Sequence, residues 1–222
     1  IITVDDAIEV IEEEVTEDIE KMAAIVPGDK PYLKTGVFET WMRRIPWLLL
    51  LMISATFTGG IINSFEKALT TVPILISFIP MLMDTGGNAG GQTSVTIIRS
   101  MAIGDVEMRD IFRVIWKELR TSILCGMTLA AVGFVKILLV DNMIFKMNVS
   151  YTEAFVICVT IMITVIFAKI VGCVLPMFAK RIGLDPAVMA SPFITTIVDA
   201  ISLSVFFTLY TCFFPIDGAY YP

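Results

Sequence analysis

Three ionisable side chains lie within long apolar stretches of the chain, where a charge is expensive. Asp84 is part of MLMDTGGNAGGQTSVTIIRS, Asp199 of SPFITTIVDAISLS and Lys169 of VIFAKIVG. A charge at the centre of a bilayer costs roughly 2.5–3.5 kcal/mol on insertion scales, so such residues are functional candidates by default. For Lys169, pairing with an acid or a polar cavity is favoured over a long reach to the membrane surface, and no role follows from it.

Asp84 begins a polar face that recurs every fourth residue of a helix and continues through Asn88, Gln92 and Thr96. Gly87 lies beside this face, and glycines let another backbone approach closely and leave carbonyl oxygens accessible, as in transporters whose helices open around an ion. The alternative is a packing face, because the glycines of this segment have GxxxG spacing. Packing explains the glycines but not the carboxylate and the amides, and both can hold together. We predict that the pore is lined here by Asp84, Gly87, Asn88 and Gln92.

Asp199 lies near the middle of the last apolar stretch, on a face of hydroxyl groups. Helical spacing puts Ser191, Thr195 and Ser202 on that face, with Thr196 beside it. The opposite positions are aliphatic and suit lipid or packed helices. The alternative is a structural aspartate, hydrogen-bonded to a neighbouring helix. We predict that this face also lines an ion path, with Asp199 at its centre.

Carboxylates, amides, hydroxyls and backbone carbonyls form a set of hard oxygen ligands, which suits Mg²⁺, Ca²⁺ or Mn²⁺ rather than zinc or copper. The chain contains no histidine and its four cysteines are scattered singly, which excludes His-ligated zinc and Ser-His-Asp catalysis within this chain. One aspartate is a weak divalent site, but a twofold dimer would bring two copies of Asp199 together. Because Mg²⁺ gives up water reluctantly, such a site would hold it partly or wholly hydrated. These arguments do not choose the metal.

Membrane helices are the elements that position these residues. The chain is 56% hydrophobic and 17% charged, and nine of its 22 acids fall within the first 20 residues, so the acidic balance belongs to the N-terminal segment. The second apolar segment contains Pro73, Pro80 and the glycine cluster, so we expect a kinked or locally opened helix there. Roughly 20 apolar residues cross about 30 Å of hydrocarbon, which predicts an all-α, polytopic membrane protein with five spans at about 46–64, 70–98, 119–140, 154–178 and 187–214.

Two amphipathic stretches precede the first span. Residues 3–26 predict a pair of amphipathic helices, opened by a capping box between Thr3 and Asp6. After PGDKP, an aromatic and basic stretch suits either an interfacial anchor or a gating element. Lysine and arginine are concentrated before the first span, between the second and third spans and after the fourth, which all lie on one side of the membrane. The positive-inside rule therefore puts the N-terminus in the cytoplasm and the C-terminus outside. The candidate gating residues are Phe38, Trp41, Arg43 and Arg44.

Two motifs, PMLMDTGGNAGGQTS and LDPAVMASPFITTIVDAISL, resemble those of the bacterial MgtE magnesium transporter/channel family in sequence and in order. The resemblance covers about residues 32–214. It implies a homodimer with five spans per subunit and a pore at the subunit interface, lined by the second and fifth spans. It also implies that paired Asp199 carboxylates recognise hydrated Mg²⁺, helped by the backbone of Thr195.

The resemblance divides the chain into three parts. Residues 1–31 look like the remnant of a second CBS domain and its connecting segment, residues 32–44 resemble an amphipathic plug helix, and residues 45–215 form the pore domain. The regulatory N-terminal part of the family is largely missing from this sequence, so we expect Mg²⁺-dependent gating to be weakened or lost.

The sequence therefore predicts Mg²⁺ transport across the cell membrane through a dimeric, channel-like pore, and no enzyme activity. The expected partners are a second copy of the chain and the lipid bilayer, with Mg²⁺ as transported ion and ligand and no nucleic acid. An ion- or proton-coupled carrier, with Asp84 or Asp199 as a proton relay, is the alternative. An intramembrane aspartyl protease with these two residues as a dyad is disfavoured, because neither lies in a YD or GxGD context. A purely structural subunit leaves both polar faces unexplained.

Overall fold

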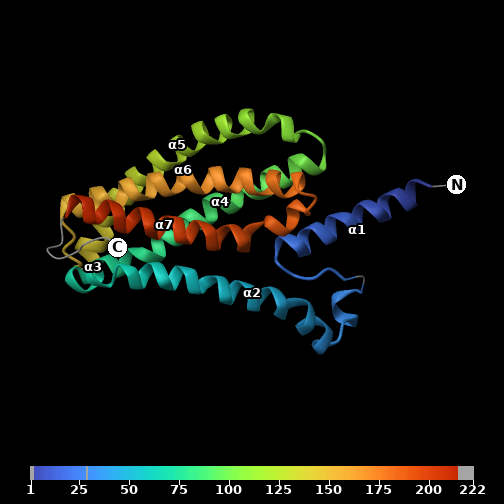
Figure 1. Cartoon of the computed structure of the whole chain (residues 1–222), viewed down its shortest axis with the longest axis horizontal. Coiled ribbons are helices and arrows are strands. Elements are labelled where there is room, and N and C mark those ends of the chain that lie inside the picture. The colour runs from blue at the N-terminus through green and yellow to red at the C-terminus, as the bar shows by residue number, and fades with distance from the viewer. Residues whose placement is uncertain (1–2, 29, 215–222) are drawn as a thin grey trace.

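The computed structural model describes residues 3–28 and 30–214, apart from the side chains of Lys67, Thr71 and Ser191, and this described part is helical without a strand (Figure 1). The predicted all-α class is confirmed over these residues. The α-helices are α1 (Val4–Met22), α2 (Val37–Ser64), α3 (Glu66–Thr71), α4 (Ile79–Ala102), α5 (Ile111–Lys136), α6 (Tyr151–Arg181) and α7 (Ser191–Phe213). Short 3-10 segments occur at Tyr32–Lys34, Pro73–Phe78, Met108–Asp110 and Pro186–Met189, and Ile137–Ile144 continues α5 as a π-helix.

Four helical stretches of the described chain are long and apolar enough to cross a membrane: Val37–Ser64, Met108–Ile144, Tyr151–Arg181 and Pro186–Phe213. These correspond to the first, third, fourth and fifth predicted spans. Helix α4 has 24 residues, which at about 1.5 Å per residue also exceeds the hydrocarbon thickness. It falls outside the apolar set because its middle carries a carboxylate, amides and glycines.

The second predicted span differs from the expectation of an opened helix. The chain breaks before the glycines, at the 3-10 segment Pro73–Phe78, and α4 then runs as regular α-helix through the whole glycine cluster. Pro80 stands in the first turn of α4, where its missing N–H leaves no hydrogen bond unmade. The glycines stay helical because neighbouring helices pack directly against them. The alternative of a local opening at the glycine cluster was therefore wrong, whereas the irregular segment at Pro73–Phe78 agrees with the alternative of a kinked helix.

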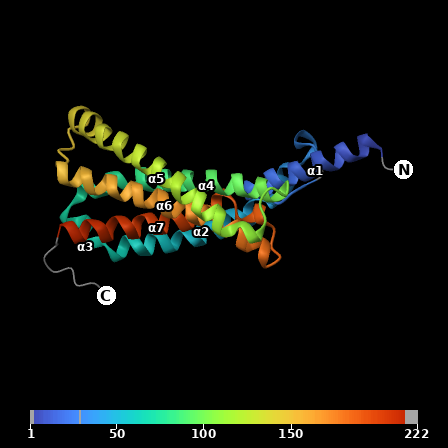
Figure 2. The same ribbon diagram turned by 90° about the horizontal axis from the view of Figure 1, so that it is seen from above.

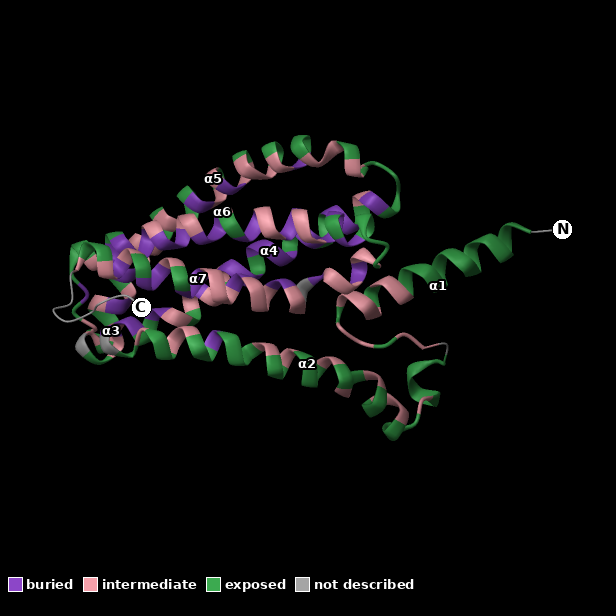
Figure 3. Cartoon of the chain, in the orientation of Figure 1, coloured by how far each residue is buried: buried purple, intermediate pink, exposed green. Residues whose placement is uncertain are grey.

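Helix α4 occupies the centre of the bundle. It packs against both α6 and α7, while α5 lies along the outer side of α6 and α2 along α7 (Figures 1 and 2). Figure 3 shows the consequence: α4 and α6 carry most of the buried surface, and α2 and α5 are largely exposed. Of the most apolar window of each helix, 56% is buried in α6 but only 6% in α2. An apolar exterior around a buried centre is the pattern expected of helices that face lipid.

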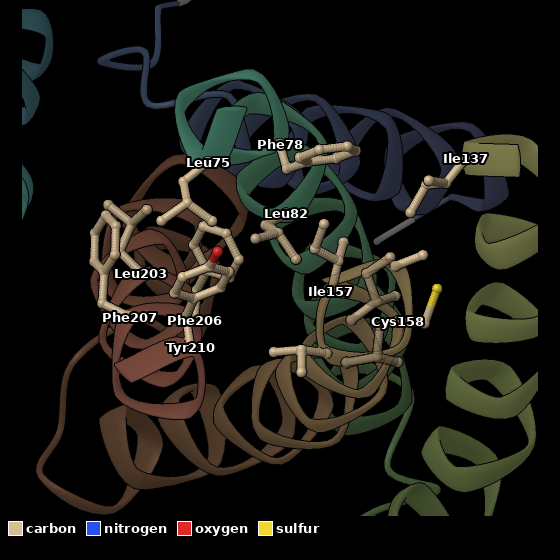
Figure 4. Packing of buried hydrophobic residues seen from close by; sticks show 14 of the residues in the cluster. Leu75, Phe78, Leu82, Ile137, Ile157, Cys158, Leu203, Phe206, Phe207 and Tyr210 are labelled. Carbon is tan, nitrogen blue, oxygen red and sulfur yellow. The ribbon is translucent and has the colours of Figure 1, made fainter. Parts of the chain in front are cut away.

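The largest fully buried side chains gather at the end of the bundle where the 3-10 segment Pro73–Phe78 and the start of α4 lie beside the end of α7. Leu75 and Leu82 are fully buried there beside the aromatic rings of Phe206, Phe207 and Tyr210 (Figure 4). The Tyr210 hydroxyl donates a 3.2 Å hydrogen bond to a carboxylate oxygen of α6. This cluster fixes one end of α4 against α7.

The N-terminal stretch forms one helix, not the predicted pair. Helix α1 begins with the expected capping box, in which the Thr3 hydroxyl accepts from the Asp6 amide and the Asp6 carboxylate accepts from the Thr3 amide. It ends at Met22, and Ala24 then takes a left-handed conformation with φ of 56°. Only a few residues separate this turn from Pro27, which is too short a stretch for a second stable helix.

Candidate functional site

The predicted polar face of α4 exists and is open. Asp84, Asn88 and Gln92 lie on its exposed side, and their side chains make no hydrogen bond or ion pair within the described chain. Thr96, the next position of the series, donates to the Gln92 carbonyl at 2.8 Å. In a membrane, polar groups without a protein partner require water or an ion. This face is therefore a set of oxygen ligands with unused bonding capacity.

The glycines of α4 lie on its packed side. A Cβ atom added at Gly86 would be 2.7 Å from Thr164 Cγ2, and one at Gly87 would be 2.9 Å from Thr195 Cγ2. A Cβ at Gly172 of α6 would collide with the carbonyl oxygen of Gly90. Only glycine permits these approaches. Gly87, which we expected to line a pore, is buried against Thr195, and the packing alternative accounts for the glycines.

Close packing of α4 on α7 brings the two membrane carboxylates into one region. Gly90 lies against Ile194, and Gly86 against Val198, so the two helices run in opposite directions. This register places Asp199 beside the start of the α4 face, near enough for the charge of Asp84 to act on it. Asp199 is half-buried and, in the described chain, has no hydrogen-bond donor. The alternative of an aspartate hydrogen-bonded to a neighbouring helix thus finds no support in the described contacts.

The other predicted residues of α7 differ in how far their side chains are buried. The hydroxyls of Thr195 and Thr196 both donate to the Pro192 carbonyl, at 2.9 and 3.1 Å. Ser202 is fully buried beneath α4 and donates to the Val198 carbonyl, so its side chain does not reach the open face. The side chain of Ser191 lies outside the described residues.

A cavity of about 540 Å³ lies between α4, α5 and α6. Asp84, Asn88 and Gln92 form one wall, and Lys169 of α6 contributes to another. The expected pairing of Lys169 is confirmed: its ammonium donates to the Thr93 hydroxyl at 3.1 Å and lies 3.7 Å from a carboxylate oxygen of α5. The lining is completed by Thr85, Ala89, Leu124, Cys125, Thr128, Leu129 and Val165.

Among the described residues, no three or more His, Cys, Asp or Glu side chains are arranged so that they could hold a metal ion. One chain therefore offers an open oxygen surface with Asp84 and Asp199, rather than a closed cage. Such a surface suits a cation that keeps part of its water shell, because Mg²⁺ commonly contacts protein through water.

The four candidate gating residues lie in the first turns of α2, which continues without interruption through Pro46 into the first span. No helix end separates residues 37–44 from the span, whereas Tyr32–Lys34 is a separate 3-10 turn before α2 begins. The rings of Phe38 and Trp41 lie 5.3 Å apart. Arg43 pairs with Glu39 at 2.7 Å, and its carbonyl accepts from the Val26 amide. These contacts tie the start of α2 to the segment after α1, and Arg44 stays a prediction without a described partner.

An ion pair that the sequence analysis missed joins α1 to the segment preceding α7. The Lys21 ammonium lies 2.6 Å from Asp185 and also contacts Glu17. The hydrogen bond with Asp185 raises the pKa of Lys21. Burial raises the pKa of Asp185, but the Lys21 ammonium and the Ala187 amide outweigh burial and leave this pKa below its usual value. Because 164 residues separate the partners, no local pattern reveals the contact.

A family model described as a divalent cation transporter, MgtE, matches residues 79–209, which extend from the start of α4 almost to the end of α7. The chain belongs to the MgtE family. The resemblance predicted from the two motifs is thereby confirmed, as is the expectation of a transporter family rather than an enzyme. Both polar faces and Lys169 lie within the matched MgtE range.

Three curated MgtE proteins are similar over nearly the whole chain. The magnesium transporter MgtE of Thermus thermophilus is 35% identical over 209 residues, and that of Bacillus subtilis is 36% identical over 213 residues. That of Enterococcus faecalis is 30% identical over 213 residues. The alignments cover 94–96% of this chain but 45% of each relative, so the chain spans about half the length of the MgtE proteins it matches.

Proposed function

We propose that this chain moves Mg²⁺ across the cell membrane through a channel-like pore formed between two copies. The observation that carries the proposal is the open face of α4 and α7, where Asp84, Asn88, Gln92 and Asp199 present oxygen atoms without protein partners. The names of the three relatives, all magnesium transporters, support Mg²⁺ as the transported ion.

A second copy completes the site. One Asp199 carboxylate is a weak ligand for a divalent cation, whereas a twofold axis beside the open face would place two Asp199 carboxylates around one path. Hydrated Mg²⁺ would pass between them, with its water shell contacting the carboxylates and the Thr195 backbone. The amide oxygens of Asn88 and Gln92 would line the same path from α4. The exposed positions of Asp84, Asn88 and Gln92 on α4 support this arrangement.

The proposed membrane topology has five spans, with α4 as the second along the chain. Helix α4 packs between α6 and α7, both of which are long and apolar enough to cross a bilayer, and its open polar face would meet water in the pore rather than lipid. The Lys180 ammonium donates to the Met101 carbonyl, and the Lys21 ammonium donates to Asp185. These two contacts place the basic loops and the N-terminal segment at the same end of the bundle (Figure 1). The positive-inside rule makes that end cytoplasmic.

Uptake into sealed liposomes tests this function. The purified chain is incorporated into liposomes containing a Mg²⁺-sensitive dye, and entry is followed after external Mg²⁺ is added, with protein-free liposomes as the control. We expect uptake driven by the Mg²⁺ gradient alone, without an imposed gradient of another ion. We also expect the chain to be a dimer in the membrane. Absence of uptake above the protein-free level would refute Mg²⁺ transport by this chain.

A coupled carrier is the second candidate, favoured by the proximity of Asp84 to Asp199, since neighbouring carboxylates can share a proton. Measuring the Mg²⁺ current at several pH values and with sodium removed separates the two. A channel-like pore conducts along the Mg²⁺ gradient alone, whereas a carrier requires the second ion.

A further inference from the structure

A buried polar network lies beside the open face and supplies no ligand to the proposed ion path. The Lys169 ammonium of α6 donates to the Thr93 hydroxyl of α4 at 3.1 Å, and that hydroxyl donates to Glu118 of α5 at 3.1 Å. The Lys169 and Glu118 side chains are only 9% and 13% exposed. Three helices thus meet through a single hydroxyl group that accepts from a cation and donates to an anion.

At the level of this network, the contact between α4 and α6 defines distance better than rotation. Gly90 and Gly172 bring the two backbones together there without side chains that could interlock, while Ile97 and Met101 of α4 share an apolar cluster with side chains of α6 further along the helix. Small-residue contacts of this kind permit close approach, and hydrogen bonds between membrane helices add direction to them. Because charged hydrogen bonds have demanding geometry, the Thr93 hydroxyl can occupy its place between Lys169 and Glu118 in only a narrow range of α4 rotations.

The rotation of α4 determines where its open face points. Thr93 directly follows Gln92, and Lys169 lines the same cavity as Gln92, Asn88 and Asp84. Since these residues belong to one rigid helix, a turn of α4 about its axis moves all three open-face side chains together. A network that holds Thr93 therefore also aims the oxygen ligands.

We propose that Lys169, Thr93 and Glu118 form a positioning network that fixes the rotation of α4 and so aims the carboxylate and amide oxygens of its open face at the transported cation. The inference rests on the proposed function, because it concerns the affinity of the same path. None of the three residues contacts the ion in this account. Their effect is expected in the Mg²⁺ concentration at which transport is half-saturated.

A matched pair of substitutions at Thr93 tests the network with both charges intact. Thr93→Val keeps the shape but removes the bridging hydroxyl, and Thr93→Ser keeps the hydroxyl. In the liposome assay we expect Thr93→Val to raise the half-saturating Mg²⁺ concentration about tenfold, since small misplacements of aligned groups have effects of this order or larger. Thr93→Ser is expected to stay near the wild-type value.

Removing both charges at once gives an independent test. The double variant Lys169→Met with Glu118→Met leaves no unpaired charge, and apolar replacement of a whole buried ion pair is often tolerated by the fold. We expect a folded protein with a raised half-saturating Mg²⁺ concentration. The matched control is Lys136→Met with Asp141→Met, which removes a 2.8 Å ion pair whose members do not line the cavity; its half-saturation should equal that of wild type.

The outcomes separate the inference from the function on which it rests. If the wild type carries no Mg²⁺, the proposed function fails. If the wild type transports and both Thr93→Val and the Lys169/Glu118 double variant keep the wild-type half-saturation, the network is only structural and the inference is overturned, whatever happens to the thermal midpoint. If Thr93→Ser shifts the half-saturation as much as Thr93→Val does, the hydroxyl is not the determinant and the inference is likewise overturned.

Discussion

Both sides of α4 carry polar side chains, but the two sides differ in whether these side chains have partners within the protein. On the packed side, Gly86, Gly90 and Thr93 meet α5, α6 and α7, and the single Thr93 hydroxyl has both an acceptor and a donor. On the open side, Asp84 and Asn88 have polar side chains without any described partner. The difference teaches that polarity alone does not mark an ion path in a membrane helix. Polar side chains without a partner in the protein do mark such a path, because they cost free energy in a membrane and add nothing to the stability of the fold.

This comparison predicts that changes at the packed glycine contacts act on stability and that changes on the open side act on transport. The largest stability effect is expected for Gly172→Ala, because the added Cβ would collide with the backbone carbonyl of Gly90. We expect a loss of about 1–3 kcal/mol in unfolding free energy, seen as a fall of several degrees in the thermal midpoint of the detergent-solubilised protein.

Gly60→Ala is the matched control for that substitution. Gly60 is also a helical glycine, in α2, but nothing lies within 4 Å of the position of its Cβ. Alanine is favoured over glycine inside a helix by about 1 kcal/mol, so the midpoint should stay level or rise. Equal falls at Gly60 and Gly172 would contradict the assignment of a packed side to α4.

A transport effect without a stability effect is expected for Asp84→Asn on the open side. The substitution removes a charge that has no described partner while keeping the shape, so unfolding free energy should change by less than about 0.5 kcal/mol. Mg²⁺ uptake should fall about tenfold, since a tenfold change corresponds to about 1.4 kcal/mol of lost ion stabilisation. An unchanged uptake rate would show that the open face of α4 is not part of the path.

The smallest effect is expected outside the bundle, at the ion pair between Lys21 and Asp185. The pKa of Asp185 is lowered in the folded chain, so its contribution to stability is present above the unfolded pKa near 3.8 and is lost as pH falls through the folded value. Because both side chains are partly exposed, the contribution is at most about 1 kcal/mol. Thermal midpoints of wild type and Asp185→Asn should differ slightly at pH 6, and the difference should shrink as the pH is lowered below 3.8; a constant difference would contradict the linkage.

Local patterns predicted what depends on local geometry. The capping box of Thr3 with Asp6 and the four-residue spacing of Asp84 and Asn88 follow from helix periodicity, and both appear in the structure as expected. The apolar lengths also predicted the four long apolar helices, although α2 and α5 begin 9 and 8 residues earlier than predicted. The fold class could be predicted because helices in a membrane satisfy their own backbone hydrogen bonds.

Long-range contacts explain what the sequence could not predict. The glycine cluster stays helical because of packing by residues such as Thr195, about a hundred positions further along the chain. The burial of Ser202, which we expected on the open face, results from the same close approach of α7 to α4. The partners of Lys169, at Thr93 and Glu118, likewise come from other helices. No local spacing encodes these pairings.

The central claim is that Asp199 is the ion-recognising carboxylate of the path, and Mg²⁺ uptake by Asp199 variants tests it most directly. Liposomes with wild type, Asp199→Ala, Asp199→Asn and the control Ser204→Ala are compared at equal protein content; Ser204 is an exposed serine of α7 whose hydroxyl donates to Ala200. We predict that wild type and Ser204→Ala transport Mg²⁺ alike and that both Asp199 variants lose uptake or its preference for Mg²⁺. Wild-type uptake and selectivity in both Asp199 variants would contradict the account.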